Sequence, residues 1–143
     1  MEKQEKKIKN VAAAVLIHEG KILIAQRPGR DLLAGRWEFP GGTVEQGETL
    51  ENCLKREFRE EFDLDIMTGP FMGAHLHHYL HGPVRLHVYF ASWQGGKLNC
   101  KVHGDYRWVT TKELCQFEFS QADKPFVERL QEKGLPFFPS QKK

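Results

Sequence analysis

The first part of the chain is a pattern of short apolar runs separated by polar turns. Residues 11–17 and 21–26 are apolar runs on either side of His18-Glu19-Gly20, and a glycine at such a junction predicts a β-hairpin. Apolar runs return later in the chain, and further strands are expected at residues 71–80, 84–93 and 106–109. Toward the end of the chain, a short helical turn is expected at 111–116 and a last helix at 124–133.

The segment after Thr49 has the spacing of an amphipathic helix. Leu50, Leu54, Phe58 and Phe62 fall at i, i+4, i+8 and i+12, so they form one apolar stripe that faces a core. The Thr49 hydroxyl can accept from a free N–H group of the first turn. Strands on both sides of a central helix, with a second helix at the end, predict an α/β fold with a mixed sheet between helices.

The same helix carries a dense group of carboxylates. Glu57 lies three residues before Glu60 and four before Glu61, so these side chains crowd one face beside the apolar stripe. A divalent cation such as Mg²⁺ would relieve their repulsion, and it readily shares oxygen ligands with substrate phosphates. Arg56 can reach Glu60 or turn back toward Glu48. The alternative is a solvated, charged helix face, although such faces usually mix lysine among the glutamates.

This stretch resembles the box of the Nudix hydrolase family. That box reads Gly, five residues, Glu, seven residues, then Arg-Glu-apolar-any-Glu-Glu-any-Gly-apolar. The chain matches it at Gly42, Glu48, Arg56, Glu57, Phe58, Glu60, Glu61 and Leu64. It departs at Asp63, where the family usually has glycine. Aspartate tolerates left-handed backbone better than most residues, so little effect on metal binding is expected. The resemblance extends from about Val11 to Leu130.

The resemblance implies a single Nudix domain over residues 1–143, with the box at 42–64 and flexible ends at 1–6 and 137–143. It implies an α/β/α sandwich with a mixed sheet between the helices. It also implies a MutT-like enzyme that uses Mg²⁺, or Mn²⁺, to cleave nucleoside triphosphates to monophosphate and pyrophosphate. Oxidised nucleotides such as 8-oxo-dGTP are typical substrates of that branch, whose members clean the nucleotide pool and so serve DNA repair.

Roles for individual residues follow from the resemblance. The metal ligands that it implies are the Gly41 carbonyl and the carboxylates of Glu57, Glu60 and Glu61. Glu57 is also the best candidate for the general base, with Arg56 orienting it. Glu48 supports the loop or a further metal. The alternative for Gly41 is a simple turn after Pro40.

Three positions are candidates for substrate binding. Arg27 matches a family arginine that approaches the phosphates, although a surface arginine is an equal alternative. Gly42, like Gly41, lets the backbone approach a phosphate closely because no side chain intervenes. Asp123 lies in a segment that resembles the base-reading loop of MutT-type enzymes. Ionised, it only accepts hydrogen bonds and suits a cytosine amine, whereas a protonated Asp123 could also donate. It could equally cap the helix that follows.

One departure concerns the general base. Many members of this branch carry a glutamate six residues before the tryptophan that is Trp108 here, and this chain has Val102 there. Asp105 is the nearest carboxylate and is either a replacement or a turn residue. Glu57 therefore remains the best candidate.

Other activities stay open at this stage. CTP or methylated dCTP are alternative substrates to 8-oxo-dGTP, whereas ADP-ribose and diadenosine polyphosphates are less expected. Tyr79 lies near a tyrosine position of the dinucleotide-polyphosphate members, but a strand tyrosine needs no such explanation. A non-catalytic module that senses a nucleotide or binds RNA is a different class, and such modules typically lose the box glutamates that this chain keeps. A zinc site at His75 and His77 lacks matching further ligands.

Composition narrows the partners. The chain has 143 residues and a net charge of +2, so no overall charge draws it to duplex nucleic acid or to a membrane. No apolar run approaches the roughly 18 residues that span a bilayer. The odd count of three cysteines suggests free thiols of a reducing cytoplasm. A nucleoside triphosphate is the expected partner, and a monomer or a homodimer the expected state.

Overall fold

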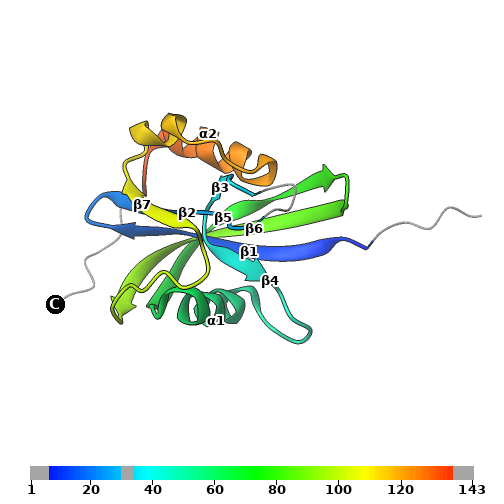
Figure 1. Ribbon diagram of the computed structural model, residues 1–143, viewed down its shortest axis with the longest axis horizontal. Helices are drawn as coiled ribbons and strands as arrows, with labels where there is room; N and C mark the ends of the chain where they lie inside the picture. Colours follow the sequence, from blue (N-terminus) through cyan, green and yellow to red (C-terminus); the bar gives the residue numbers. More distant parts are fainter. Residues whose placement is uncertain (1–6, 30–33, 137–143) are drawn as a thin grey trace, which may run out of the picture.

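A seven-stranded mixed sheet lies between two helices, α1 (Leu50–Phe62) and α2 (Lys124–Lys133), as Figure 1 shows. The structure is a computed structural model that describes residues 7–29 and 34–136. The predicted flexible ends and part of the loop before Trp37 lie outside the described residues. The layered arrangement confirms the α/β fold with a mixed sheet between helices.

The remaining elements follow the expected order along the chain. They are β1 (Lys9–His18), β2 (Lys21–Gln26), β3 (Trp37–Glu38), β4 (Gly41–Thr43), β5 (Asp65–Tyr79), β6 (Gly82–Gly95), β7 (Asp105–Val109) and the 3₁₀ helices η1 (Lys112–Gln116) and η2 (Gln121–Asp123). Both expected helices are present, and β5 and β6 are longer than predicted. The short strands β3 and β4 were not among the expected elements, and the glycines of β4 had left a turn as the alternative.

The sheet has the order β3-β2-β1-β6-β5, with β4 paired to β1 and β7 paired to β2. Only the β1–β6 pair is parallel, and all other pairs of named strands are antiparallel. β1 pairs with β2 at its C-terminal end (Ile17 opposite Ile22) and with β4 near its start (Val11 opposite Thr43). The two strands thus share one edge of β1, and β4 carries Gly41 and Gly42 alongside it.

Alternate residues of β1 face two separate cores. Ala12, Ala14 and Leu16 pack with Leu54, Phe58 and Phe62 of α1, while Ala13 and Val15 pack in the core that contains Phe126, Val127 and Leu130 of α2. The predicted stripe on α1 is confirmed, since Leu54, Phe58 and Phe62 are fully buried. Burying each of these side chains stabilises the fold by about 2 kcal/mol, and this holds the helix against the sheet.

Local signals close α1 at both ends. The Thr49 hydroxyl accepts from the Asn52 N–H at 3.0 Å, as predicted for the cap. Asp63 ends the helix with left-handed backbone (φ 58°, ψ 30°), the conformation for which the family uses glycine. Its carboxylate accepts from Lys101 Nζ at 2.7 Å and from Asn99 Nδ2 at 3.2 Å. The aspartate therefore ties the loop before β7 to the end of α1.

Within the described residues, no helix has the length and apolar character needed to cross a bilayer. The three cysteines are free thiols, with Cys53 buried and Cys115 exposed. His75 and His77 lie side by side, with 6.1 Å between ring centroids. No group of three or more potential metal-binding side chains surrounds them in the part of the chain that the structure describes.

Candidate active site

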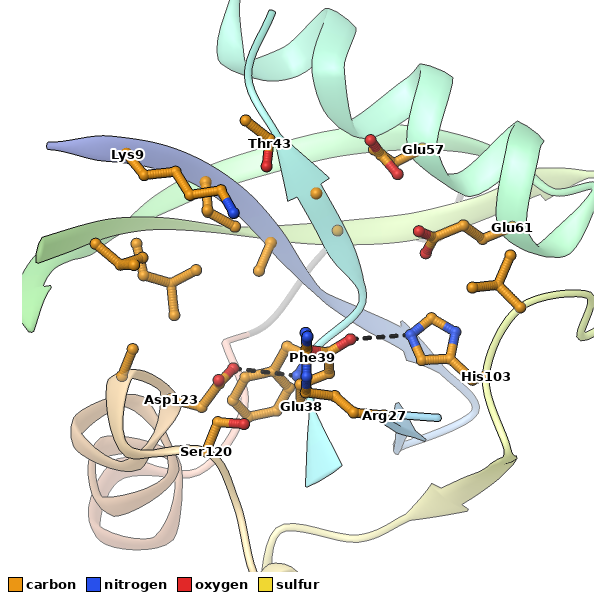
Figure 2. A pocket seen from close by; sticks show the side chains of 18 of the residues that line it. Lys9, Arg27, Glu38, Phe39, Thr43, Glu57, Glu61, His103, Ser120 and Asp123 are labelled. Carbon is orange, nitrogen blue, oxygen red and sulfur yellow. Dashed lines mark hydrogen bonds and ion pairs between the residues drawn. The ribbon is translucent and has the colours of Figure 1, made fainter. Parts of the chain in front are cut away.

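A cavity of about 920 Å³ opens beside β4, over the first residues of β1 and the facing part of β6. Figure 2 shows Glu57 and Glu61 on one side of it and Phe39, Ser120 and Asp123 on the other. The fold brings these side chains together from α1, from the residues between β3 and β4, and from the residues just before α2. We call the side with Glu57 and Glu61 the metal end, and the side with Phe39 and Asp123 the base end.

The two glycines of β4 let the backbone pass closely between β1 and α1. A Cβ on Gly41 would lie 1.8 Å from the carbonyl oxygen of Ala12, and a Cβ on Gly42 would lie 2.2 Å from Cδ of Glu57. Neither position can therefore carry a side chain without displacing a neighbour. Close approach, rather than an unusual turn, is why glycine is required here.

Arg56 is the centre of the carboxylate cluster. Its Nε donates to Glu48 at 2.6 Å, and its Nη1 donates to Glu57 at 2.9 Å and to Glu60 at 3.2 Å. A further bond, from Nη2 to the Thr43 carbonyl at 3.2 Å, ties the arginine to β4. The hydrogen bond from Arg56 lowers the pKa of Glu48 to about 2, so Glu48 stays ionised. Arg56 thus makes both of the contacts that were predicted for it as alternatives, one with Glu60 and one with Glu48.

The Oε1 atom of Glu61 is buried at the metal end and has no hydrogen-bond partner. Burial raises its pKa to about 9, and the hydrogen bond and charge of Glu57 add to that shift. A carboxyl group in this situation is protonated unless a cation arrives. A divalent ion fits the site, because it would satisfy the orphaned oxygen and stabilise the ionised form.

The described residues contain no group of three side chains from His, Cys, Asp and Glu that could hold a metal alone. A bound ion would therefore need oxygen ligands beyond the side chains of Glu57 and Glu61, and the Gly41 carbonyl stays a predicted ligand beside substrate phosphates. The side chain of Glu60 is 60% exposed and lies outside the residues that line the cavity, although it shares Arg56. Its role as a ligand stays a prediction.

Asp123 lies at the base end, and its side chain does not cap α2. Although it occupies the N-cap position, it makes no capping hydrogen bond. Its Oδ1 instead accepts from the Phe39 N–H at 3.2 Å. The residue is 5% exposed, and burial, reinforced by the charge of Glu38, raises its pKa well above the ordinary value. Burial thus favours the neutral acid at Asp123, a form that can donate as well as accept.

Tyr79 joins the base end to the edge of the sheet. Its hydroxyl oxygen accepts from the Ala122 N–H at 2.9 Å, which holds the start of α2 against β5. Ser120 lines the cavity nearby, and its buried Oγ has no hydrogen-bond partner. The base end therefore offers polar atoms that a nucleobase can satisfy. Trp37 and Phe39 are core residues, 9% and 2% exposed, and Phe39 also lines the cavity.

Glu38 and His103 are among the cavity residues that the sequence analysis missed. Glu38 accepts from Arg27 Nη1 at 3.2 Å and from His103 Nε2 at 2.9 Å. Arg27 thus lines the cavity as expected, with one nitrogen committed to a carboxylate. Glu38 directly precedes Phe39 and the glycine pair, and His103 directly follows Val102. Those neighbours were the only signals available in the sequence.

Val102 lines the cavity and is 49% exposed. Asp105 is not among the cavity residues. Its carboxylate accepts from Arg107 Nη1 at 2.7 Å and from the Tyr106 N–H at 2.8 Å, as a residue at the start of a strand commonly does. Whether Asp105 serves the chemistry stays a prediction, which its position does not favour.

The comparisons with known proteins agree with this site. The sequence matches the NUDIX domain over residues 12–129. It is 34% identical over 122 residues to the CTP pyrophosphohydrolase of Escherichia coli, covering 85% of this chain and 90% of that protein. It is 35% identical over 123 residues to a putative 8-oxo-dGTP diphosphatase of Mycobacterium tuberculosis, covering 84% and 86%.

Solved structures give the same result. The Escherichia coli ORF135 protein matches with a TM-score of 0.78 at 33% identity, covering 88% of this chain and 90% of that one. A MutT protein from Staphylococcus aureus matches with a TM-score of 0.74 at 36% identity, covering 90% and 99%. The box on α1, the glycine pair beside it and these matches over most of the chain show that the protein belongs to the Nudix hydrolase family.

Proposed function

We propose that this protein is a Mg²⁺-dependent pyrophosphohydrolase that converts a nucleoside triphosphate and water into the monophosphate, pyrophosphate and a proton. The observation that carries the proposal is the arrangement of the cavity. One end presents Glu57, Glu61 and the glycine pair, which suit a metal and phosphates. The other end presents Asp123 and Phe39, which suit a base. Two relatives that align over most of the chain have names that describe the hydrolysis of nucleoside triphosphates.

In this proposal the Gly41 carbonyl and the carboxylates of Glu57, Glu60 and Glu61 would hold the metal, and a bound ion would neutralise phosphate charge and acidify the attacking water. Arg56 orients Glu57 through a hydrogen bond of 2.9 Å, so that carboxylate is placed to accept the proton of that water as well as to ligate the metal. Glu48 fixes Arg56 from the opposite side. Gly42 leaves the space that the Glu57 carboxyl group occupies. Arg27 and Glu38 line the wall between the two ends.

For the base, we infer that Asp123 acts as a neutral acid. With Oδ1 occupied by Phe39, the other oxygen presents one O–H donor and lone pairs as acceptors. Such a pair matches a base edge that has a donor beside an acceptor. Cytosine has that combination at its amine and N3, and guanine oxidised at C8 has it at O6 and the protonated N7. Ordinary guanine presents only acceptors on that edge. With Asp123 placed on the O6–N7 edge of a purine, rather than on the O6 and N1–H of guanine, CTP and 8-oxo-dGTP are both proposed as substrates, in preference to dGTP.

A non-catalytic nucleotide-sensing or RNA-binding module is the competing proposal, and Val102 is the feature in its favour. The retained glutamates and their packing around Arg56 weigh against it. We further infer that the enzyme acts on free nucleotides in the cytoplasm, as a monomer or homodimer. The free thiols and the small net charge support that inference.

The direct test is a panel of nucleoside triphosphates, including CTP, 5-methyl-dCTP, dGTP and 8-oxo-dGTP, assayed for pyrophosphate release. Activity should require Mg²⁺ or Mn²⁺ and stop with a chelator. ADP-ribose and diadenosine polyphosphates serve as negative controls. Tight nucleotide binding without turnover of any of these triphosphates would favour the sensing module.

A further inference from the structure

The carboxylate of Glu38 is held from two sides within the cavity wall. Arg27 Nη1 donates to Oε1 and His103 Nε2 donates to Oε2, at 3.2 and 2.9 Å. The side chain is only 17% exposed, so its two partners replace much of its water. A carboxylate has about four acceptor positions, which leaves two for a ligand. Glu38 is thus an oriented acceptor rather than a solvated charge.

His103 is the more deeply buried of the two partners. Its side chain is 3% exposed, and its ring stacks on Phe62 at 5.3 Å between centroids with 11° between planes. Since a carboxylate can only accept, Nε2 carries the proton in this pair. The Nδ1 atom is buried without a hydrogen-bond partner. A polar ring is costly to bury with one nitrogen unsatisfied, which suggests that the bond to Glu38 is what retains histidine here.

The loop that carries His103 is fastened on both sides. The Asn99 N–H donates to the Phe62 carbonyl at 2.9 Å, and the Lys101 N–H donates to the Glu61 carbonyl at 3.0 Å. Past His103, the Gly104 N–H donates to the Gln26 carbonyl at 3.0 Å. The ring is therefore fixed relative to the last turn of α1 and to β2, the strand that precedes Arg27.

Glu38 also adjoins the base end. The next residue, Phe39, gives its N–H to Asp123, and the charge of Glu38 is felt at Asp123. A chain of contacts thus runs from the helix of the metal end through Phe62, His103 and Glu38 to the base end. Figure 2 shows the pair of His103 and Glu38 between Glu61 and Asp123.

We propose that His103 is a positioning residue that holds Glu38 against the nucleoside half of the substrate, where Glu38 accepts hydrogen bonds from sugar or base donor groups. This inference rests on the proposed function. It assigns His103 to nucleoside binding, although the residue lies next to the end of the metal-binding helix. The alternative, a role for His103 in the metal end, makes a different prediction for Mg²⁺.

The test compares His103→Leu, which keeps an apolar side chain against Phe62 but removes the donor, with His103→Gln, whose amide nitrogen can take the place of Nε2. With CTP, His103→Leu should raise KM about 10-fold, the effect of losing a hydrogen bond to a charged group. The kcat value and the Mg²⁺ concentration for half-maximal rate should stay close to those of the wild type. His103→Gln should recover most of the loss, and melting temperatures report on folding in each case.

Glu38→Ala and the double variant complete a cycle. If His103 acts through Glu38, adding His103→Leu to Glu38→Ala should have little further effect on KM. Effects that multiply in the double variant would overturn the proposal. So would a shift in Mg²⁺ requirement with an unchanged KM, because it would place His103 at the metal end.

Calorimetric binding of α,β-methylene CTP, which cannot be cleaved, repeats the comparison without turnover. A wild-type protein that binds this analogue but cleaves no triphosphate would end the proposed function. The cycle in binding affinity would still decide the role of His103. Equal affinities of the wild type and His103→Leu would contradict that role.

Discussion

The carboxyl group of Glu57 occupies the space where a side chain on Gly42 would begin. A Cβ built on Gly42 would lie 2.2 Å from Cδ and 2.3 Å from Oε2 of Glu57. The atoms in the way belong to the end of a side chain, whereas those facing Gly41 belong to the backbone of β1. The two glycines should therefore respond differently to the same substitution.

Gly42→Ala should reduce activity with little loss of stability. The methyl group pushes Glu57 aside, and displacing a catalytic group by about 1 Å can cost roughly 100-fold in rate. Gly41→Ala instead forces β4 away from Ala12 and should cost about 1–3 kcal/mol of stability, as overpacking does. Turnover and thermal unfolding of both variants check this. A Gly42→Ala protein with wild-type turnover would refute the placement of Glu57 in the site.

Glu57→Gln keeps the size of the side chain and removes its charge. The variant should lose about 100-fold or more in kcat, because the positioned group no longer takes a proton or ligates the metal. Glu128→Gln is the matched control, since the same change on the exposed face of α2 should leave kcat unaltered. The assignment fails if Glu57→Gln retains full turnover while its circular dichroism shows an intact fold.

The parts of the fold that could be predicted from the sequence are those whose signals lie in neighbouring residues. The start of α1 followed from Thr49 and the apolar stripe, and the last helix was expected at 124–133, where the structure has α2. The beginning of β5 was missed because Gly69-Pro70 interrupts the run. The structure accommodates that pair with register shifts around Phe71 on an edge strand, where a missing N–H costs no sheet hydrogen bond.

The residues of the candidate site also differ in whether local sequence signals could predict them. Residues of the box were predictable, because fixed spacing along one helix sets their mutual positions. The pair of Glu38 and His103 was not, since 65 residues separate its members and only the tertiary fold brings them together. The protonation of Asp123 was open for the same reason. Burial determines it, and burial depends on how α2 packs against Phe39.

Asp105→Asn should change kcat less than about 2-fold, because the carboxylate is partly exposed, lies outside the cavity and pairs with Arg107. Val102→Glu places a carboxylate on the cavity wall and should lower the Mg²⁺ concentration for half-maximal rate. Metal titrations of both variants separate the two positions. A large kcat loss in Asp105→Asn, without loss of fold, would show that Asp105 serves as the replacement carboxylate.

Asp123→Asn should alter the choice of base. Asparagine keeps the acceptor for the Phe39 N–H but presents only N–H donors to the base, whereas the neutral acid presents a hydroxyl that also accepts. The ratio of kcat/KM for CTP to that for dGTP should fall, by about 5- to 150-fold for one hydrogen bond to a base edge, because dGTP presents only acceptors on its O6–N7 edge. The melting temperature should change little, since the side chain does not cap α2. Asp65→Asn, on an exposed strand end, is the control. An unaltered ratio would remove Asp123 from base recognition.

The raised pKa of Glu61 predicts how the stability of the fold depends on pH and on metal binding. Its pKa in the folded protein, about 9, lies above the ordinary value of 4.5, so folding favours the protonated form. Its contribution to stability is thus fully present below about pH 4.5 and is lost as the pH rises toward 9. A divalent cation favours the ionised form, so it should offset this loss and release a proton on binding.

Thermal unfolding in a chelator should therefore show a melting temperature that falls from pH 5 to pH 9, and Mg²⁺ should raise that temperature more at pH 9 than at pH 5. Asp123 has a raised pKa too and contributes a slope of the same sign. Glu61→Gln should consequently reduce the slope without abolishing it, and it should remove most of the stabilisation by Mg²⁺. Equal stabilisation of Glu61→Gln and the wild type by Mg²⁺ at pH 9 would mean that the ion binds without Glu61.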